Sequence, residues 1–145
     1  MSRQIFKGHF SYLLSDPEGT TFKQDIPFEM SLDFKNDTFK GTLVDDETKG
    51  LFEKPITVNG FVEADQISFV VMYPHNYWID KITNQVIIDY QNDYPGCQYI
   101  GVYNLEADKY EGEWTITVKQ NKTGNWQTDT IDIYISGTWE MQRVE

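Results

Sequence analysis

The chain has 145 residues, of which 39% are hydrophobic and 15% aromatic, and a formal net charge of −11 from 12 Lys and Arg against 23 Asp and Glu. This length predicts one domain, residues 1–145, with a hydrophobic core. A chain of this charge is repelled by phosphate backbones and anionic lipids, so we expect no nucleic-acid partner. The single cysteine, Cys97, excludes an internal disulfide and with it a disulfide-framed secreted domain.

The N-terminal residues alternate between polar and apolar and contain no continuous apolar stretch of the kind found in signal peptides. Nowhere does an apolar run approach the ~18 residues of a transmembrane helix. We therefore expect a soluble, cytoplasmic protein without membrane insertion. A secreted form whose signal has been removed stays open as the alternative.

Alternating apolar and polar side chains predict a series of strands joined by short turns. The alternation is strongest from Ile26 to Phe34, where every second residue is apolar. The segment from Trp78 to Gln85 fits a strand, a loop or a helical turn equally well. In chain order, apolar stripes predict strands within 6–14, 26–34, 39–43, 56–62, 67–73, 86–88, 99–103, 110–118 and 131–141.

A short pattern recurs on the apolar face of these strands: a large apolar residue, any residue, glycine, any residue, a large apolar residue. Its glycines are Gly8, Gly41, Gly60, Gly101, Gly112 and Gly137. Glycine within a strand marks a bend or a close backbone approach, so six on one face indicate a strongly curved sheet. An open sheet would also expose long apolar edges. We therefore predict an all-β fold, an up-and-down antiparallel β-barrel of about 8–10 strands, with a β-sandwich as the alternative.

The meander, the inward glycines and the pairs Gly112-Glu113-Trp114 and Gly137-Thr138-Trp139 resemble the calycin-type barrels: lipocalins, fatty-acid-binding proteins and avidin-like proteins. The first strand has Gly8-His9-Phe10 where lipocalins carry their Gly-x-Trp. The segment 16–21 is too short for the helical pair of fatty-acid-binding proteins. The resemblance implies a barrel that often holds a small, largely apolar molecule.

Aromatic side chains dominate the predicted interior and form the first candidate site. An eight-stranded barrel is wide enough either to be filled by its side chains or to hold one small ligand. Aromatic walls with a few hydroxyl and indole donors suit a small-molecule pocket. The residues predicted to line it are Phe10, Tyr12, Phe28, Met30, Phe69, Tyr73, Tyr99, Tyr103, Trp114 and Trp139.

The predicted loop from Tyr73 to Asp80 is the second candidate, because polar and aromatic groups on a loop suit a barrel mouth. Its residues of interest are His75, Asn76, Tyr77, Trp78 and Asp80. His75 would act as an acid or base if Asp80 or another carboxylate oriented it. Nothing in the sequence fixes such a geometry, so the favoured interpretation is a loop whose aromatic rings pack on the barrel rim.

Metal and cofactor sites are not expected. Two histidines and one cysteine cannot supply four zinc ligands without carboxylates. Asp45-Asp46-Glu47 lacks the spacing of a calcium loop and is predicted to be a solvated acidic turn. Cys97 is interpreted as a small packing residue.

Three functions follow from these observations. The first is binding of a small apolar or aromatic molecule inside the barrel. The second is a filled barrel that acts as an interaction or structural module through the loop from Pro74 to Asp80 or through a homodimer. The third and least supported is a small enzyme that uses His75. The dimer face would contain Val70, Met72, Ile100 and Val102, apolar residues on the outward phase of their strands.

Overall fold

The computed structural model describes residues 2–15, 18–80, 82–83, 85–91, 94–121 and 130–144. This part of the chain contains strands and turns, and no helix in it is long and apolar enough to cross a membrane. The strands are β1 (Ser2–Ser15), β2 (Thr21–Lys35), β3 (Thr38–Asp45), β4 (Ile56–Glu63), β5 (Gln66–Met72), β6 (Asn76–Ile79), β7 (Val86–Asp89), β8 (Cys97–Asn104), β9 (Lys109–Asn121) and β10 (Thr130–Arg143).

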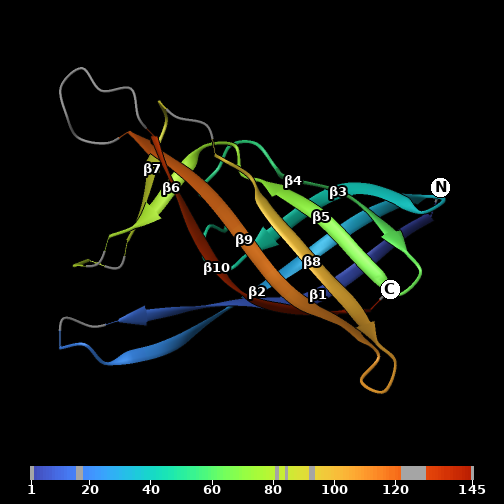
Figure 1. Ribbon diagram of the computed structural model, residues 1–145. Coiled ribbons are helices and arrows are strands. Elements are labelled where there is room, and N and C mark those ends of the chain that lie inside the picture. The colour runs from blue at the N-terminus through green and yellow to red at the C-terminus, as the bar shows by residue number, and fades with distance from the viewer. Residues whose placement is uncertain are drawn as a thin grey trace.

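Eight of these strands form a closed antiparallel barrel in the order β1-β10-β9-β8-β5-β4-β3-β2 (Figure 1). Each barrel strand pairs with the barrel strands that precede and follow it along the chain, and β5 pairs with β8 across the inserted β6 and β7. The ring closes where β1 pairs with β10, from Phe6↔Arg143 to Ser11↔Thr138. The predicted up-and-down barrel is confirmed, and the sandwich alternative is wrong. Closure leaves the barrel without a free strand edge, which removes the exposed edges of an open sheet.

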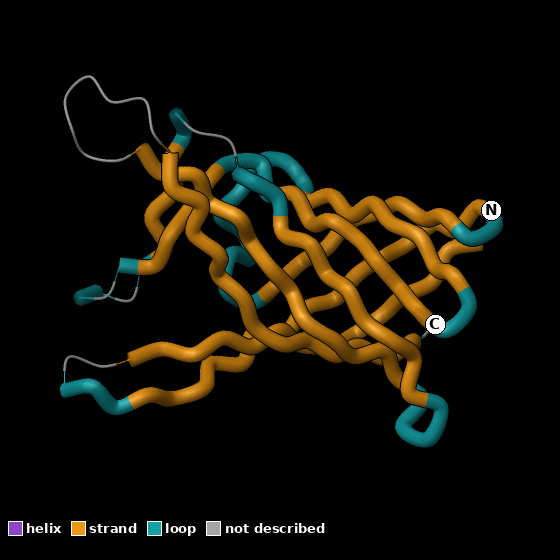
Figure 2. Tube along the Cα trace, in the orientation of Figure 1, coloured by secondary structure: helices purple, strands orange, loops and turns teal. Residues whose placement is uncertain are grey.

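The strands β6 and β7 pair only with each other and stand outside the barrel at one end (Figure 2). They are inserted between β5 and β8, and the termini lie at the opposite end (Figure 1). Four residues of the predicted loop, Asn76–Ile79, therefore form a strand. Alternation was a poor guide here because Tyr77, Trp78 and Ile79 are three apolar residues in succession, so β6 has no alternating pattern.

The alternation of β2 shows how the sequence produces this fold. Ile26, Phe28, Met30 and Leu32 are all buried, and Glu29 between them is exposed. At the interior glycines neighbouring strands come very close. A Cβ atom on Gly112 would overlap the carbonyl oxygen of Ile100. The predicted role of these glycines in a tightly curved sheet is therefore confirmed.

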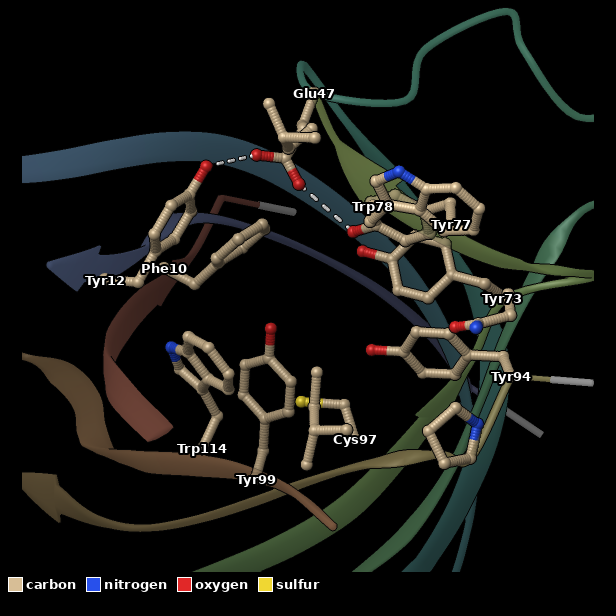
Figure 3. Close-up of a pocket in the computed structure, with 14 residues that line it drawn as sticks. Phe10, Tyr12, Glu47, Tyr73, Tyr77, Trp78, Tyr94, Cys97, Tyr99 and Trp114 are labelled. Atoms are coloured by element: carbon tan, nitrogen blue, oxygen red, sulfur yellow. Dashed lines mark hydrogen bonds between the residues drawn. The ribbon is translucent and has the colours of Figure 1, made fainter. Parts of the chain in front are cut away.

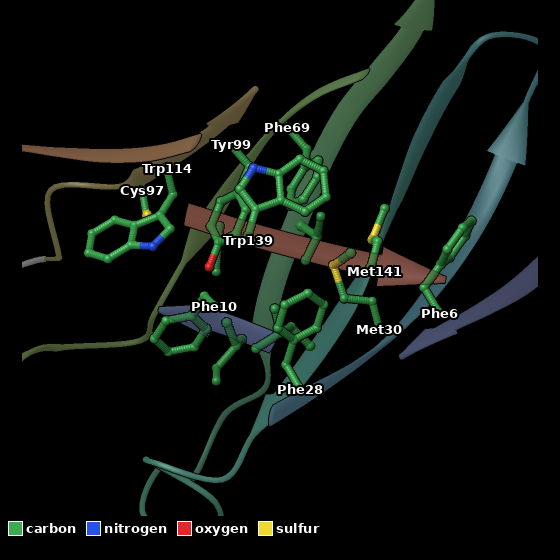
Figure 4. Close-up of a cluster of buried hydrophobic side chains, with 14 of the residues drawn as sticks. Phe6, Phe10, Phe28, Met30, Phe69, Cys97, Tyr99, Trp114, Trp139 and Met141 are labelled. Atoms are coloured by element: carbon green, nitrogen blue, oxygen red, sulfur yellow. The ribbon is translucent and has the colours of Figure 1, made fainter. Parts of the chain in front are cut away.

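Side chains fill the barrel interior toward the termini. There Phe69 stacks on Tyr99 with ring centroids 4.7 Å apart, and Trp139 lies edge-on to Phe69 at 5.4 Å. The Trp139 indole N–H donates to the carbonyl oxygens of Glu113 (3.1 Å) and Ile100 (3.3 Å). This packed cluster, part of which is drawn in Figure 4, includes Phe6, Phe28, Met30, Leu32, Phe39, Leu43, Val58, Ile67, Phe69, Trp139 and Met141.

Candidate ligand cavity at the barrel mouth

Toward the end of the barrel that carries β6 and β7, the interior is not filled. A cavity of about 230 Å³ lies there, below the roughly 300–1,000 Å³ of pockets for drug-sized ligands. Its walls come from β1, β6, β8, β9 and the connections after β3, β5 and β7. The lining residues are Phe10, Tyr12, Glu47, Tyr73, Asn76, Tyr77, Trp78, Ile79, Tyr94, Pro95, Cys97, Tyr99, Trp114 and Ile116.

Aromatic rings pack against one another along this wall. Tyr73 contacts Tyr94 and Tyr77 with ring centroids 4.7 and 5.0 Å apart, so segments before and after the β6–β7 hairpin are joined to it by aromatic contacts. On the opposite side, Trp114 lies edge-on to Phe10 at 6.2 Å. The hydroxyls of Tyr94 and Tyr99 point into the space between these groups (Figure 3). The surface of the cavity is thus mainly apolar, with a few tyrosine hydroxyl groups exposed on it.

Glu47 places a carboxylate at the cavity (Figure 3). It accepts hydrogen bonds from the hydroxyls of Tyr12 (2.6 Å) and Tyr77 (3.1 Å), and so joins β1 to β6. Burial raises the pKa of Glu47, and the nearby Asp45 adds to this, while the two tyrosine hydrogen bonds act in the opposite direction. Within the described part of the chain, the donors that hold this carboxylate are neutral hydroxyls and not cations.

Asp45 lies directly behind this group at the end of β3 and is fully buried. It accepts hydrogen bonds from the Tyr73 hydroxyl and, at 2.7 and 2.8 Å, from the backbone N–H and the hydroxyl of Thr48. The predicted solvated acidic turn is therefore wrong for Asp45. The same alternation that places Leu43 inside the barrel also places Asp45 inside, and this was the signal in the sequence.

His75 lies outside the lining of the cavity. Its Nε2 is 2.9 Å from Oε1 of Glu53, and its ring packs against Tyr90 at 4.8 Å. The hydrogen bond from His75 lowers the pKa of Glu53. Asp80, suggested by the sequence as one possible orienting carboxylate, instead accepts the backbone N–H groups of Ile82 (2.8 Å) and Thr83 (3.3 Å).

The predicted interior residues divide into three groups. Phe28, Met30, Phe69 and Trp139 are buried in the core and are not among the residues that line the cavity. Tyr103 lies near the β8–β9 turn, where it packs on Tyr110 at 5.2 Å and donates to Asp108. The residues that the structure does bring to the cavity are Phe10, Tyr12, Tyr73, Tyr99 and Trp114, together with Asn76, Tyr77 and Trp78 of the predicted mouth loop.

Sequence reasoning missed several lining residues, chief among them Glu47 and Tyr94. Tyr94 follows the β6–β7 insertion, and only the chain's return to the barrel at Cys97 brings it to the mouth.

Cys97 is buried, as expected for a packing residue, and burial raises the pKa of its thiol to about 12. Among the residues that the structure describes, no group of three or more His, Cys, Asp or Glu could hold a metal ion.

The proposed dimer face lies on the outside of β5 and β8. Its four apolar side chains are each between 38% and 56% exposed: Val70, Met72, Ile100 and Val102.

Comparisons of the chain with protein-family models, curated proteins and solved structures found no match. The functional argument therefore depends on the chemistry of the cavity and of this surface.

Proposed function

We propose that the protein binds a small organic molecule with an apolar or aromatic body in the cavity at the barrel mouth. One observation carries the proposal: the cavity of about 230 Å³ is walled mainly by aromatic rings, with a carboxylate and a few hydroxyls among them. Small-molecule sites are concave, mostly apolar and equipped with a small number of polar groups that fix the orientation of the ligand.

The fold supports the same proposal. A closed eight-stranded antiparallel barrel is compatible with the calycin-type architecture that the glycine and tryptophan pattern resembles. In barrels of this size the interior can hold one small ligand. We propose that here the packed cluster closes the end toward the termini and the ligand enters past β6 and β7. The protein would then be a binding protein rather than a filled scaffold.

Titration with an environment-sensitive apolar fluorophore tests this proposal. We expect a saturable rise in its emission at one fluorophore per chain. Ile116→Trp should abolish the rise because Ile116 lines the cavity and a larger ring would occupy it. Val44→Trp is the matched control, since Val44 is exposed on the outer face of β3 and lies outside the apolar face of β5 and β8. If the wild-type protein shows no saturable rise, or if both variants behave alike, the proposal is wrong.

A second candidate function is an interaction module that forms a homodimer. It is favoured by the exposed apolar side chains on the outside of β5 and β8, Val70, Met72, Ile100 and Val102. Such a dimer would elute from a sizing column at twice the monomer mass, and Met72→Lys would dissociate it by placing a charge in the interface. Thr138→Lys, at an exposed position on β10, should leave it intact. A monomer across the concentration range would contradict this candidate.

A further inference from the structure

The polar chemistry of the cavity is acidic, and this limits which ligand it can hold. We propose that the ligand is a small organic cation, an ammonium group on a compact organic body, held by Glu47 and the surrounding aromatic rings. This inference rests on the proposed function, because it requires that the cavity binds a ligand. It adds the sign of the ligand's charge and the groups that recognise it.

The first argument is the charge of the lining. Among the described residues that line the cavity, Glu47 alone is ionisable at neutral pH, and none is Lys, Arg or His. Asp45 stands close behind it, joined to the wall through Tyr73. An anionic ligand would face two carboxylates, and a neutral one would leave Glu47 partly buried with no counter-ion among the residues that the structure describes. A cation is the ligand that supplies the missing charge.

The second argument is the hydrogen-bonding capacity of Glu47. An ionised carboxylate offers about four lone-pair sites. The hydroxyls of Tyr12 and Tyr77 occupy one site on each oxygen, since Tyr12 donates to Oε2 and Tyr77 to Oε1. Both oxygens therefore keep lone pairs that can face the positive charge of a ligand, or accept a hydrogen bond from it where its ammonium carries N–H groups. The raised pKa of Glu47 agrees with a carboxylate that lies partly buried before its cation arrives.

The third argument is the composition of the rest of the wall. Tyrosine and tryptophan rings attract cations through the negative potential of their faces, and this recognition suits ammonium groups that are shielded from water. The rings come from separate elements around the cavity, so they surround a ligand rather than line one side. They are Tyr12 and Phe10 on β1, Tyr73 after β5, Tyr77 and Trp78 on β6, Tyr94 before β8, Tyr99 on β8 and Trp114 on β9.

A pair of probes with the same shape separates charge from size. Choline carries a trimethylammonium group, and 3,3-dimethylbutan-1-ol replaces its nitrogen with carbon and is neutral. Binding of each to the full-length chain would be measured by isothermal titration calorimetry at mildly alkaline pH, and located by the NMR shift of the Trp114 indole N–H. We expect choline to bind at least about tenfold more tightly than the neutral probe.

Glu47→Gln should weaken choline binding by about tenfold and leave the binding of the neutral probe unchanged, because the variant keeps the size of the side chain and removes its charge. Glu63→Gln is the matched control, since it changes the net charge equally at an exposed position at the end of β4. It should leave both affinities unchanged.

The possible outcomes distinguish this inference from the proposed function. If the neutral probe binds as tightly as choline, or if the apolar fluorophore binds and choline does not, the cavity is a binding site but its ligand is not a cation. An equal loss in the Glu47 and Glu63 variants would also overturn the inference. If neither probe nor the fluorophore binds, both the inference and the proposed function are wrong.

Discussion

Glu47 is the single residue that gives the barrel mouth its chemical character. It is partly buried, its partners are the neutral hydroxyls of Tyr12 and Tyr77, and Asp45 lies nearby with the same charge. Burial without a cation raises its pKa from the ordinary 4.5. The folded protein therefore binds this proton more tightly than the unfolded chain does.

This difference predicts how stability depends on pH. The stabilising contribution of protonated Glu47 is fully present below pH 4.5 and is lost as the pH rises from there through the folded-state pKa. Glutamine does not titrate, so Glu47→Gln does not lose this contribution. As the pH rises from 4.5 through the folded-state pKa of Glu47, we therefore expect the free energy of unfolding of the variant to increase relative to that of the wild-type protein. Thermal unfolding of both proteins at a series of pH values measures it.

The quantity to follow is the difference in free energy of unfolding between the variant and the wild-type protein at each pH. Lowered pKa values at Asp25, Glu53 and Glu140 act in the opposite direction, because each stabilises the fold as the pH rises. These contributions are common to the wild-type protein and the variant and therefore cancel. Glu63→Gln, which changes the same charge at an exposed position, should show a constant difference. A constant difference for Glu47→Gln as well would contradict the assignment.

At the scale of the strands, glycine and tryptophan act as a pair. Gly112 of β9 lies opposite Trp139 of β10, and Gly137 of β10 lies opposite Trp114 of β9. The Trp114 indole N–H donates to the carbonyl oxygen of Ser11 at 3.0 Å, one strand further on. The Trp114 ring covers Gly137 and the Trp139 ring covers Gly101 on the next strand, β8, because the absence of a side chain at each glycine leaves room for the ring. The pattern Gly-x-Trp in the sequence is the local form of this packing.

Gly112→Ala tests how much of the fold depends on the close approach of β8 and β9. The new Cβ would overlap the Ile100 carbonyl oxygen and lie 2.5 Å from the Gly101 Cα, both backbone atoms that cannot move aside alone. We expect the free energy of unfolding to fall by about 3 kcal/mol. Urea unfolding followed by tryptophan fluorescence measures this change.

Gly50→Ala provides the control for that measurement. Nothing lies within 4 Å of its Cβ position, but its φ of +78° is in the left-handed region. Gly50→Ala should therefore lower the free energy of unfolding by about 1 kcal/mol, from backbone strain alone. If the two substitutions cost the same, crowding between strands would not be what makes Gly112 necessary.

At the scale of the whole molecule, the barrel has two unlike ends. Toward the termini the interior is occupied by buried side chains around Phe69 and Trp139, and toward β6 and β7 it holds the cavity. The sequence left a filled and an open barrel as alternatives, and our proposal of a ligand site at the mouth rests on the cavity there. The packed part supplies the core of the fold, so the mouth can carry a partly buried carboxylate at Glu47.

The sequence was informative wherever the pattern was long. Period two from Ile26 to Phe34 predicted β2, and the recurring glycines predicted closure, because both depend on the sheet's own geometry and need no knowledge of distant residues. The sequence was least clear from 74 to 94: it predicted a strand at 86–88, which is β7, but left the segment that contains β6 open between strand, loop and helical turn. The alternation predicts which residues point inward, but it does not separate a ring packed in the core from one at a cavity, since Trp114 and Trp139 both lie on the inward face of their strands.

By itself, then, the amino-acid sequence determined the all-β class, the meander and the inward face of long strands such as β2, because side chains alternate along any extended chain. Only the tertiary structure decided where the interior is filled and which groups meet at the mouth. Glu47 lies 35 residues from Tyr12 and 30 from Tyr77 along the chain. Their meeting depends on barrel closure and on the placement of the β6–β7 insertion, which are properties of the folded chain and not of any local pattern.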